Sequence, residues 1–231
     1  MTEKKDKTMM KEGEFSGQTY KIFIVDDHPI VRKGLSQLID QETDLLTCGE
    51  ASDAQSALQI LKKLKPDLTI VDISLQGMDG IELTKNIRAR YGNLPVLIIS
   101  MHDESLYAER ALRAGARGYI MKQEATEKMM EAIRRVIRGD LYISEKVSAG
   151  IVKKFVNGKS KRSSSPDELL SDRELEVFRL VGQGFGTRQI AEELRVSVKT
   201  VETYRANIKE KLNLKNAREL IKHAVYWLES L

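Results

Sequence analysis

The stretch LTIVDISLQGMDGIEL (Leu68 to Leu83) passes from an apolar run through a turn into a helical pattern. Its first four residues are apolar or β-branched, and Asp72 follows them directly. Glycines at positions 77 and 80 are typical of a turn, and Ile81 and Leu83 begin a helical spacing of apolar residues. The stretch therefore predicts a buried strand followed by a helix, with an aspartate where the strand ends.

Four further apolar runs of the same kind lie on either side of this stretch, and amphipathic helical patterns separate them. They are Tyr20 to Val25, Leu45 to Glu50, Pro95 to Ile99 and Gly118 to Met121. Strands that alternate with helices predict a series of βαβ units. Because the strand cores are almost continuously apolar, we expect a five-stranded parallel sheet with helices on both faces.

The remainder of the chain divides by composition. We expect residues 1–18, which interleave lysine and glutamate, to form a disordered leader, and residues 19–141 to form the α/β domain. Residues 142–169 hold one short helical pattern and a serine-rich, basic run that is typical of a linker. Residues 170–231 show helical patterns throughout, and Ser171 and Glu174 are placed to form a capping box. The 231 residues thus predict two domains.

Bulk properties exclude several classes of protein. A single cysteine, Cys48, excludes an intramolecular disulfide framework, and the three histidines are too scattered for a zinc motif. No run approaches the length of a membrane span, so we expect a cytoplasmic protein with no membrane partner. The net charge of +4 permits nucleic-acid binding without requiring it.

Polar residues of complementary chemistry stand at the ends of the predicted strands. The carboxyl ends of parallel strands converge on one edge of a sheet, where such folds bind ligands. Three carboxylates at that edge would repel one another unless a cation such as Mg²⁺ neutralised them. A lysine and a serine nearby supply a charge and a hydroxyl for phosphoryl oxygens, so an aspartate could form an acyl phosphate. These residues are Asp26, Asp27, Asp72, Ser100 and Lys122.

The motifs IFIVDD, TIVDISLQGMDGIEL, VLIISMHDE and AGARGYIMK, within residues 20 to 141, resemble the receiver domain of response regulators. The resemblance implies a flavodoxin-like fold and phosphorylation of Asp72. It also implies that Mg²⁺ is held by Asp27, Asp72 and the backbone carbonyl of Ser74, with Asp26 helping to hold it. Further implied roles are phosphate binding by Lys122 and switching by Ser100 and Tyr119. Met101 stands where many receivers have alanine, and we hypothesise that it slows autodephosphorylation.

The C-terminal region carries a short helical pattern, a tight turn at Arg195 to Ser197 and a longer helical pattern, as in a helix-turn-helix. If Val201, Tyr204, Ile208 and Leu212 face the core, a mixed set of polar, charged and small residues faces outward. Such a mixture is typical of a helix that enters the major groove of DNA.

The same region, from SDRELEV through IAEELRVSVKTVE, resembles the DNA-binding domain of the NarL/FixJ (LuxR-type) response regulators. The resemblance covers residues 170 to 228 and implies an all-α four-helix domain. Its recognition helix would run from about Val198 to Leu212. The candidate DNA-contacting residues are Lys199, Thr200, Glu202, Thr203, Arg205, Ala206 and Lys209.

Together the two resemblances imply a response regulator that is phosphorylated by a sensor histidine kinase and binds double-stranded promoter DNA. Its chemistry would be limited to Mg²⁺-dependent self-phosphorylation from a phosphohistidine donor and slow autodephosphorylation. Phosphorylation would move Ser100 and Tyr119 and then either free the recognition helix or promote a homodimer. RNA polymerase stays open as a further partner.

Two other classes of function remain open at this stage. A Mg²⁺-dependent phosphohydrolase would need a second acidic residue two positions after the nucleophile, where this chain has Ser74. A DNA-binding scaffold that ignores phosphorylation would not need the complete set of carboxylates, serine and lysine.

Overall fold

The computed structural model describes residues 18–124, 126–156 and 165–230. The expected leader and the serine-rich part of the linker therefore fall almost wholly outside the described residues. Within the described part, no helix combines the length and the apolar character needed to span a membrane.

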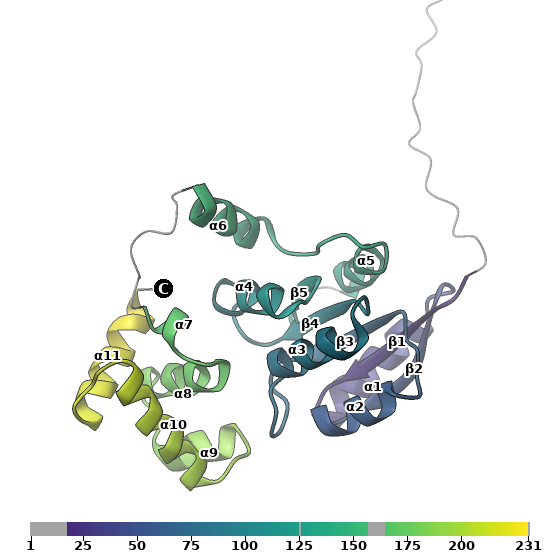
Figure 1. The fold of residues 1–231 in the computed structure, drawn as a ribbon. Helices are drawn as coiled ribbons and strands as arrows, with labels where there is room; N and C mark the ends of the chain where they lie inside the picture. Colours follow the sequence, from purple (N-terminus) through teal and green to yellow (C-terminus); the bar gives the residue numbers. More distant parts are fainter. Residues whose placement is uncertain (1–17, 125, 157–164, 231) are drawn as a thin grey trace, which may run out of the picture.

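The first domain is the predicted five-stranded parallel sheet, with strand order β2-β1-β3-β4-β5. Its strands are β1 (Tyr20–Val25), β2 (Leu45–Ala51), β3 (Leu68–Asp72), β4 (Val96–Ser100) and β5 (Gly118–Met121). Its helices are α1 (Pro29–Asp40), α2 (Ala54–Leu61), α3 (Gly80–Tyr91), α4 (Glu104–Ala114) and α5 (Thr126–Ile137). Strands and helices alternate as expected, and the ribbon shows the helices flanking the sheet (Figure 1).

Two separate apolar clusters confirm that both faces of the sheet are covered. Alternate strand residues such as Ile24 and Ile70 pack with α1 and α5 on one face. Residues of the opposite pleat, such as Val25 and Val71, pack with α2, α3 and α4 on the other. Because side chains of a strand alternate between faces, continuously apolar strands supply both clusters.

A segment after β5 stays attached to the first domain before the chain leaves it. Tyr142 forms an isolated parallel bridge with Gly118 beside β5. Helix α6 (Glu145–Val156) follows, close to the short helix expected inside the linker, and contacts α4. The chain thus remains in contact with the first domain beyond position 141, where the sequence pattern loosens.

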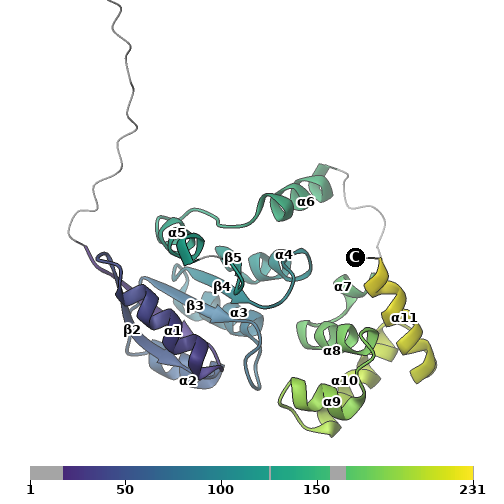
Figure 2. The same cartoon turned by 180° about the vertical axis from the view of Figure 1, so that it is seen from behind.

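The C-terminal domain contains four longer helices and one short helix. They are α7 (Pro166–Leu169), α8 (Asp172–Gly182), α9 (Thr187–Glu193), α10 (Val198–Lys211) and α11 (Ala217–Glu229). Ser171 and Glu174 form the predicted capping box of α8. Helix α7 is an addition that the sequence analysis counted within the linker. Viewed from behind, the two domains lie side by side (Figure 2), and Arg173 and Glu176 of α8 contact the first domain.

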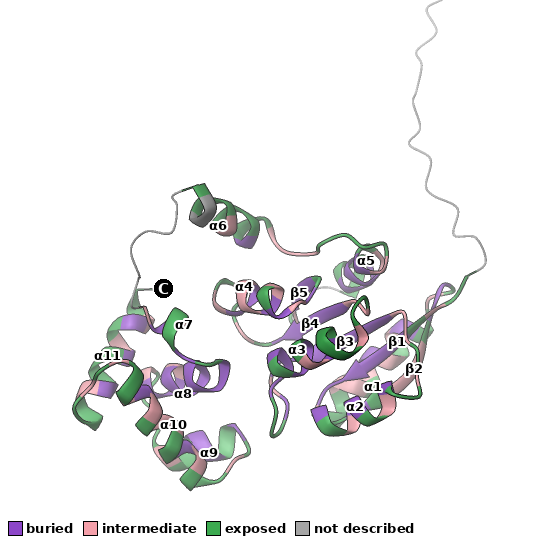
Figure 3. Cartoon of the chain, viewed as in Figure 1, coloured by how far each residue is buried: buried purple, intermediate pink, exposed green. Residues whose placement is uncertain are grey.

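Helix α8 is buried on its polar side as well as its apolar side (Figure 3). It packs against its own domain on one side and faces the first domain on the other. Four of its five charged residues, Asp172, Arg173, Glu174 and Glu176, are nearly inaccessible to solvent, and the fifth, Arg179, is half-buried. Buried side chains of both domains also form one connected cluster, which includes Leu75 and Leu175. The C-terminal domain is therefore docked onto the first domain.

Candidate functional site

The predicted acidic edge forms where β1, β3, β4 and β5 end. Asp26 directly follows β1, and Asp72 is the last residue of β3. Ser100 is the last residue of β4, whereas the sequence analysis placed it one position after the strand. Lys122 follows β5. Parallel register brings these four positions to one edge, as expected for an open α/β sheet.

Lys122 is the cation at the centre of this edge. Its Nζ lies 2.7 Å from Oδ2 of Asp26 and 2.8 Å from Oδ2 of Asp72. All three side chains are almost fully buried. Burial alone would lower the pKa of Lys122, but the two carboxylates raise it above its ordinary value, so the lysine stays charged.

Asp72 keeps one carboxylate oxygen without a partner. Burial raises the pKa of the Asp72 carboxyl above its ordinary value, although Lys122 opposes the increase. Its Oδ2 accepts a hydrogen bond from Lys122, while Oδ1 is buried with no hydrogen-bond partner among the described residues. An orphaned buried oxygen is costly unless a cation or donor completes it.

The edge fits a small divalent cation. Asp26, Asp27, His28 and Asp72 each offer one ligand atom, and these atoms lie within 4.8 Å of one another. Carboxylate oxygens are the ligands that Mg²⁺ prefers. His28 was missed by the sequence analysis, although it directly follows the aspartate pair; its Nδ1 lies 2.6 Å from Oδ1 of Asp27.

A glycine allows the turn after β3 to close tightly over Asp72. Helix α3 starts at Gly80, whose backbone N–H donates to the carbonyl of Ile73 at 2.9 Å. A Cβ at this position would lie 2.0 Å from the backbone oxygen of Asp72. Only glycine allows so close an approach, which explains the Asp-Gly pair that begins the helix.

The expected switch residues connect to the segment after β4. Ser100 is fully buried, and its Oγ accepts a hydrogen bond from the backbone N–H of His102 at 3.1 Å. Tyr119 is 2% exposed, and its hydroxyl donates to the carbonyl of His102 at 2.8 Å. Tyr119 is therefore turned inward and held by the segment after β4.

His102 joins this segment to the C-terminal domain, and the sequence analysis did not single it out. Its Nε2 lies 2.8 Å from Oγ of Ser74 and 3.3 Å from Oε1 of Glu176 in α8. Burial would raise the pKa of Glu176, but the hydrogen bond from His102 and the nearby charge of Arg173 lower it below its ordinary value. The two domains thus share a buried, hydrogen-bonded carboxylate.

Arginines from both domains make further docking contacts. Arg110 in α4 donates to the carboxylate of Asp172, to the carbonyl of Asp167 at 2.8 Å and to that of Leu170 at 2.9 Å. Arg173 in α8 donates in the opposite direction, to the carbonyl of Leu75. No local sequence signal identifies these residues, because their partners lie in the other domain.

The helix-turn-helix is formed by α9, a short turn and α10. Ser197 caps α10, its Oγ accepting a hydrogen bond from the N–H of Thr200 at 3.0 Å. Val201 and Ile208 are buried as expected, while Tyr204 and Leu212 are only half-buried. The helix ends at Lys211, so the predicted end at Leu212 is its C-cap residue.

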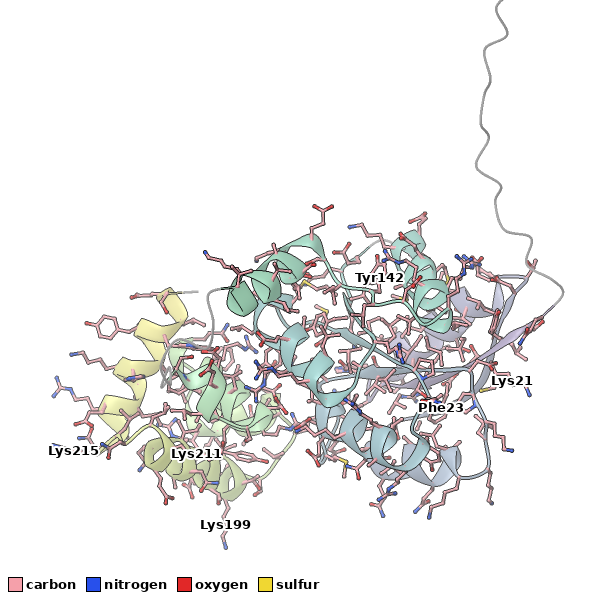
Figure 4. All side chains as sticks on the ribbon, turned by 45° about the horizontal axis from the view of Figure 1, so that its top comes forward. Lys21, Phe23, Tyr142, Lys199, Lys211 and Lys215 are labelled. Atoms are coloured by element: carbon pink, nitrogen blue, oxygen red, sulfur yellow. The ribbon has the colours of Figure 1, made fainter. Side chains whose placement is uncertain are left out.

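The candidate DNA-contacting residues lie on the outer face of α10. Lys199, Glu202, Thr203 and Ala206 are exposed, and Thr200, Arg205 and Lys209 are half-buried. Lys199 points into solvent, away from the first domain (Figure 4). Burial lowers the pKa of Arg205 from its ordinary value. The first domain therefore leaves much of this face uncovered.

A phosphate-compatible acidic edge on a doubly wound sheet, coupled to a helix-turn-helix unit, defines a two-domain signalling regulator. Residues 22–134 match the response regulator receiver domain, and residues 168–224 match the luxR family of bacterial regulatory proteins. The chain belongs to the response regulators that join a receiver to a luxR-type DNA-binding domain.

Relatives and solved structures agree with this assignment. The oxygen regulatory protein NreC of Staphylococcus carnosus (strain TM300) is 39% identical over 209 residues, covering 89% of this chain and 96% of the relative. A LuxR-family response regulator from Aurantimonas sp. SI85-9A1 is 35% identical with a TM-score of 0.56, covering 60% of this chain and 99% of that structure. RcsB from Salmonella enterica serovar Typhimurium, bound to promoter rprA with the phosphomimetic BeF3−, is 26% identical with a TM-score of 0.58, covering 90% of this chain and 99% of that structure.

Proposed function

We propose that Asp72 is the phosphoacceptor of this response regulator and that its phosphorylation controls binding to promoter DNA. The carrying observation is the buried Oδ1 of Asp72, which has no hydrogen-bond partner among the described residues, beside an oxygen held by Lys122. A carboxylate oxygen of Asp72 would form the new bond to phosphorus. The bond from phosphorus to an imidazole nitrogen of a histidine kinase would break, and the bonding pair would stay on that nitrogen. With a proton on its other ring nitrogen, the imidazole would leave as the neutral form.

The residues around Asp72 have separate roles in this transfer. Asp27, Asp72 and the backbone carbonyl of Ser74 would hold Mg²⁺, with Asp26 assisting. Such an ion would supply positive charge for the oxygens of a transferred phosphoryl group. Lys122 and Ser100 would bind the phosphoryl oxygens after transfer.

The route from phosphorylation to DNA binding is proposed to pass through His102. Ser100 and Tyr119 both hydrogen-bond the backbone of His102, and the His102 side chain reaches Glu176 of the DNA-binding domain. When the hydroxyl of Ser100 turns toward a phosphoryl oxygen, it gives up its position at the His102 N–H. The contact between His102 and Glu176 then changes, and the docked arrangement loosens.

DNA binding is assigned to the outer face of α10. Lys199, Arg205 and Lys209 would contact phosphates, and residues such as Thr200, Glu202, Thr203 and Ala206 would face base edges. Phosphorylated or DNA-bound chains would pair as homodimers on double half-sites. Such a protein would work in the cytoplasm, where kinase and promoter DNA are both available, with RNA polymerase as a further partner.

The decisive experiment uses the full chain and its Asp72→Asn variant. Mass spectrometry after treatment with acetyl phosphate and Mg²⁺ should show one added phosphoryl group on the wild type and none on the variant. The phosphodonor should then raise the affinity for promoter DNA, measured by fluorescence anisotropy, in the wild type alone. A variant whose DNA affinity still responds to the phosphodonor would contradict the proposal.

Met101 is proposed to control how long the phosphoryl group persists. It is 58% exposed and lines the cavity that contains Asp72, where it can obstruct attacking water. The Met101→Ala variant should lose its phosphoryl group with a shorter half-life than the wild type. An unchanged or longer half-life, measured by phosphate release, would remove this role.

A further inference from the structure

Arg195 extends from the DNA-binding domain into the acidic edge of the receiver. It occupies the turn between α9 and α10, with a φ of 51°. One guanidinium nitrogen donates to Oδ2 of Asp27 at 2.9 Å, and the other lies 3.4 Å from Nε2 of His28. The two ends of this contact are 168 positions apart in the sequence. It is a docking contact made by the helix-turn-helix itself.

The aspartates of the acidic edge are paired with different cationic side chains. Lys122 lies within ion-pair distance of Asp26 and Asp72. Asp27 forms its ion pair with Arg195, and its Oδ1 lies 2.6 Å from Nδ1 of the neighbouring His28. The Asp27 side chain is only 8% exposed, so its charge is poorly solvated and depends on such partners. The DNA-binding domain thus supplies a positive charge to the receiver's own site.

We propose that Arg195 acts as a stand-in cation at Asp27 and that it competes with the divalent metal for this carboxylate. This inference rests on the metal site of the proposed function. Binding of the metal and docking of the turn before α10 are then antagonistic, even before any phosphoryl group arrives. Metal binding alone would release one of the contacts that hold the helix-turn-helix against the receiver.

The competition follows from charge and from space. A guanidinium and a divalent ion both require the oxygens of Asp27, and two cations at one carboxylate repel each other. Thermodynamic linkage makes the effect reciprocal: the factor by which Arg195 weakens metal binding is the factor by which metal weakens the contact. Because the Arg195 side chain is 49% exposed, we expect a modest factor, roughly threefold.

Metal affinity provides the first test. Mn²⁺ is a suitable probe, because the signal of the free ion in electron paramagnetic resonance reports its concentration. The full-length Arg195→Gln variant should bind Mn²⁺ roughly threefold more tightly than the wild type. The matched control is Arg188→Gln, which removes an exposed arginine of α9 seven positions earlier and should leave the affinity unchanged.

A second measurement observes the contact itself. The side-chain Nε–H signal of Arg195, identified in NMR spectra by its loss in Arg195→Gln, should move as Mg²⁺ saturates the site. The corresponding signal of Arg188 should stay in place. This readout does not depend on DNA binding, in which Arg195 could also take part.

The possible outcomes separate the two proposals. Equal Mn²⁺ affinity of Arg195→Gln and wild type, or an Arg195 signal that is unmoved at saturating Mg²⁺, would overturn the competition while leaving the metal site intact. An equal gain in Mn²⁺ affinity for Arg195→Gln and Arg188→Gln would mean that only the overall charge of the protein matters. That result would also overturn the competition. If the wild type bound no Mn²⁺, or bound it equally well as Asp27→Asn, the metal site itself would fail and the competition with it.

Discussion

The acidic edge of the receiver and the outer face of α10 place their charges in opposite surroundings. At the edge, Lys122 is buried between two carboxylates that belong to the same domain. On α10, Lys199 is exposed and points away from the molecule. A buried charge such as that of Lys122 is held in place by packing and costs free energy when it is left unpaired. An exposed charge such as that of Lys199 stays free for a partner.

The charged residues at the interface between the domains are intermediate between the buried Lys122 and the exposed Lys199 in how they are paired. Arg110, Arg195 and Glu176 are charged groups whose partners belong to the other domain. These contacts between domains exist only while the domains are docked, although Glu176 also pairs with Arg173 of its own helix. A change at the receiver can therefore alter them without unfolding either domain. The same residue types can therefore serve structure, switching or recognition, according to which domain holds the partner.

Lys122 offers the largest expected effect. Lys122→Met leaves Asp26 and Asp72 buried without their shared cation and removes a binding group for the phosphoryl oxygens. We expect phosphorylation by acetyl phosphate to slow roughly 100-fold, measured as the initial rate of labelling. The control Lys128→Met removes an exposed lysine of α5 and should label at the wild-type rate. Near-normal labelling of Lys122→Met would show that the buried pairing is structural alone.

Arg110 tests the charges that are shared between domains. Arg110→Ala removes three hydrogen bonds to the C-terminal domain, and we expect docking to weaken by about 2 kcal/mol. Small-angle X-ray scattering should then give a larger radius of gyration. Arg113→Ala is the matched control, because Arg113 lies on the same helix and pairs with Glu109 of that helix. An unchanged radius in Arg110→Ala would place the docking energy in the apolar contacts.

Lys199 tests the open surface. Lys199→Ala should weaken binding to specific and nonspecific DNA to a similar extent, because a phosphate contact carries no sequence information. The slope of log affinity against log salt concentration should fall by about 0.9 in magnitude. Titrations by fluorescence anisotropy at several salt concentrations measure this slope. The control is Lys63→Ala, at an exposed position next to α2, which should keep the wild-type slope. An unchanged slope for Lys199→Ala would show that Lys199 does not contact DNA phosphates.

Asp44 and Arg134 provide the smallest expected effect, an ion pair that lies within the receiver but near its surface. The hydrogen bond from Arg134, at 2.9 Å, lowers the pKa of Asp44 below its ordinary value, although burial opposes it. A lowered pKa in the folded state stabilises the protein above the unfolded-state pKa, and this stability is lost as pH falls through the folded-state pKa. Asp44→Asn should therefore cost about 1 kcal/mol near neutral pH.

This cost should shrink as the pH falls below the unfolded-state pKa and through the lower folded-state pKa, because Asp44 of the wild type then takes up a proton. Urea unfolding at a series of pH values measures it. The exposed Asp140→Asn should show no comparable pH dependence. A cost for Asp44→Asn that stays constant with pH would exclude the ion pair as its source.

Much of the receiver site could be predicted because its residues follow from local pattern and topology. Asp72 and Lys122 directly follow apolar runs, and parallel strands carry such positions to one edge whatever the loops do. Residues such as His102 and Arg110 could not be predicted in the same way. His102 lies within the motif VLIISMHDE and Arg110 within a predicted helix, but the role of each arises from a partner more than sixty positions away.

The alternation of strands and helices and the acidic edge could be predicted from the sequence alone, as could the exposure of Lys199, Glu202, Thr203 and Ala206 in α10. Periodicity and turn chemistry act over a few residues, so they can be recognised without coordinates. Only the tertiary structure shows that Tyr119 lies inward, that α8 is buried on its charged side and that Arg195 contacts Asp27. These features depend on how one domain packs against the other, which no short-range pattern encodes.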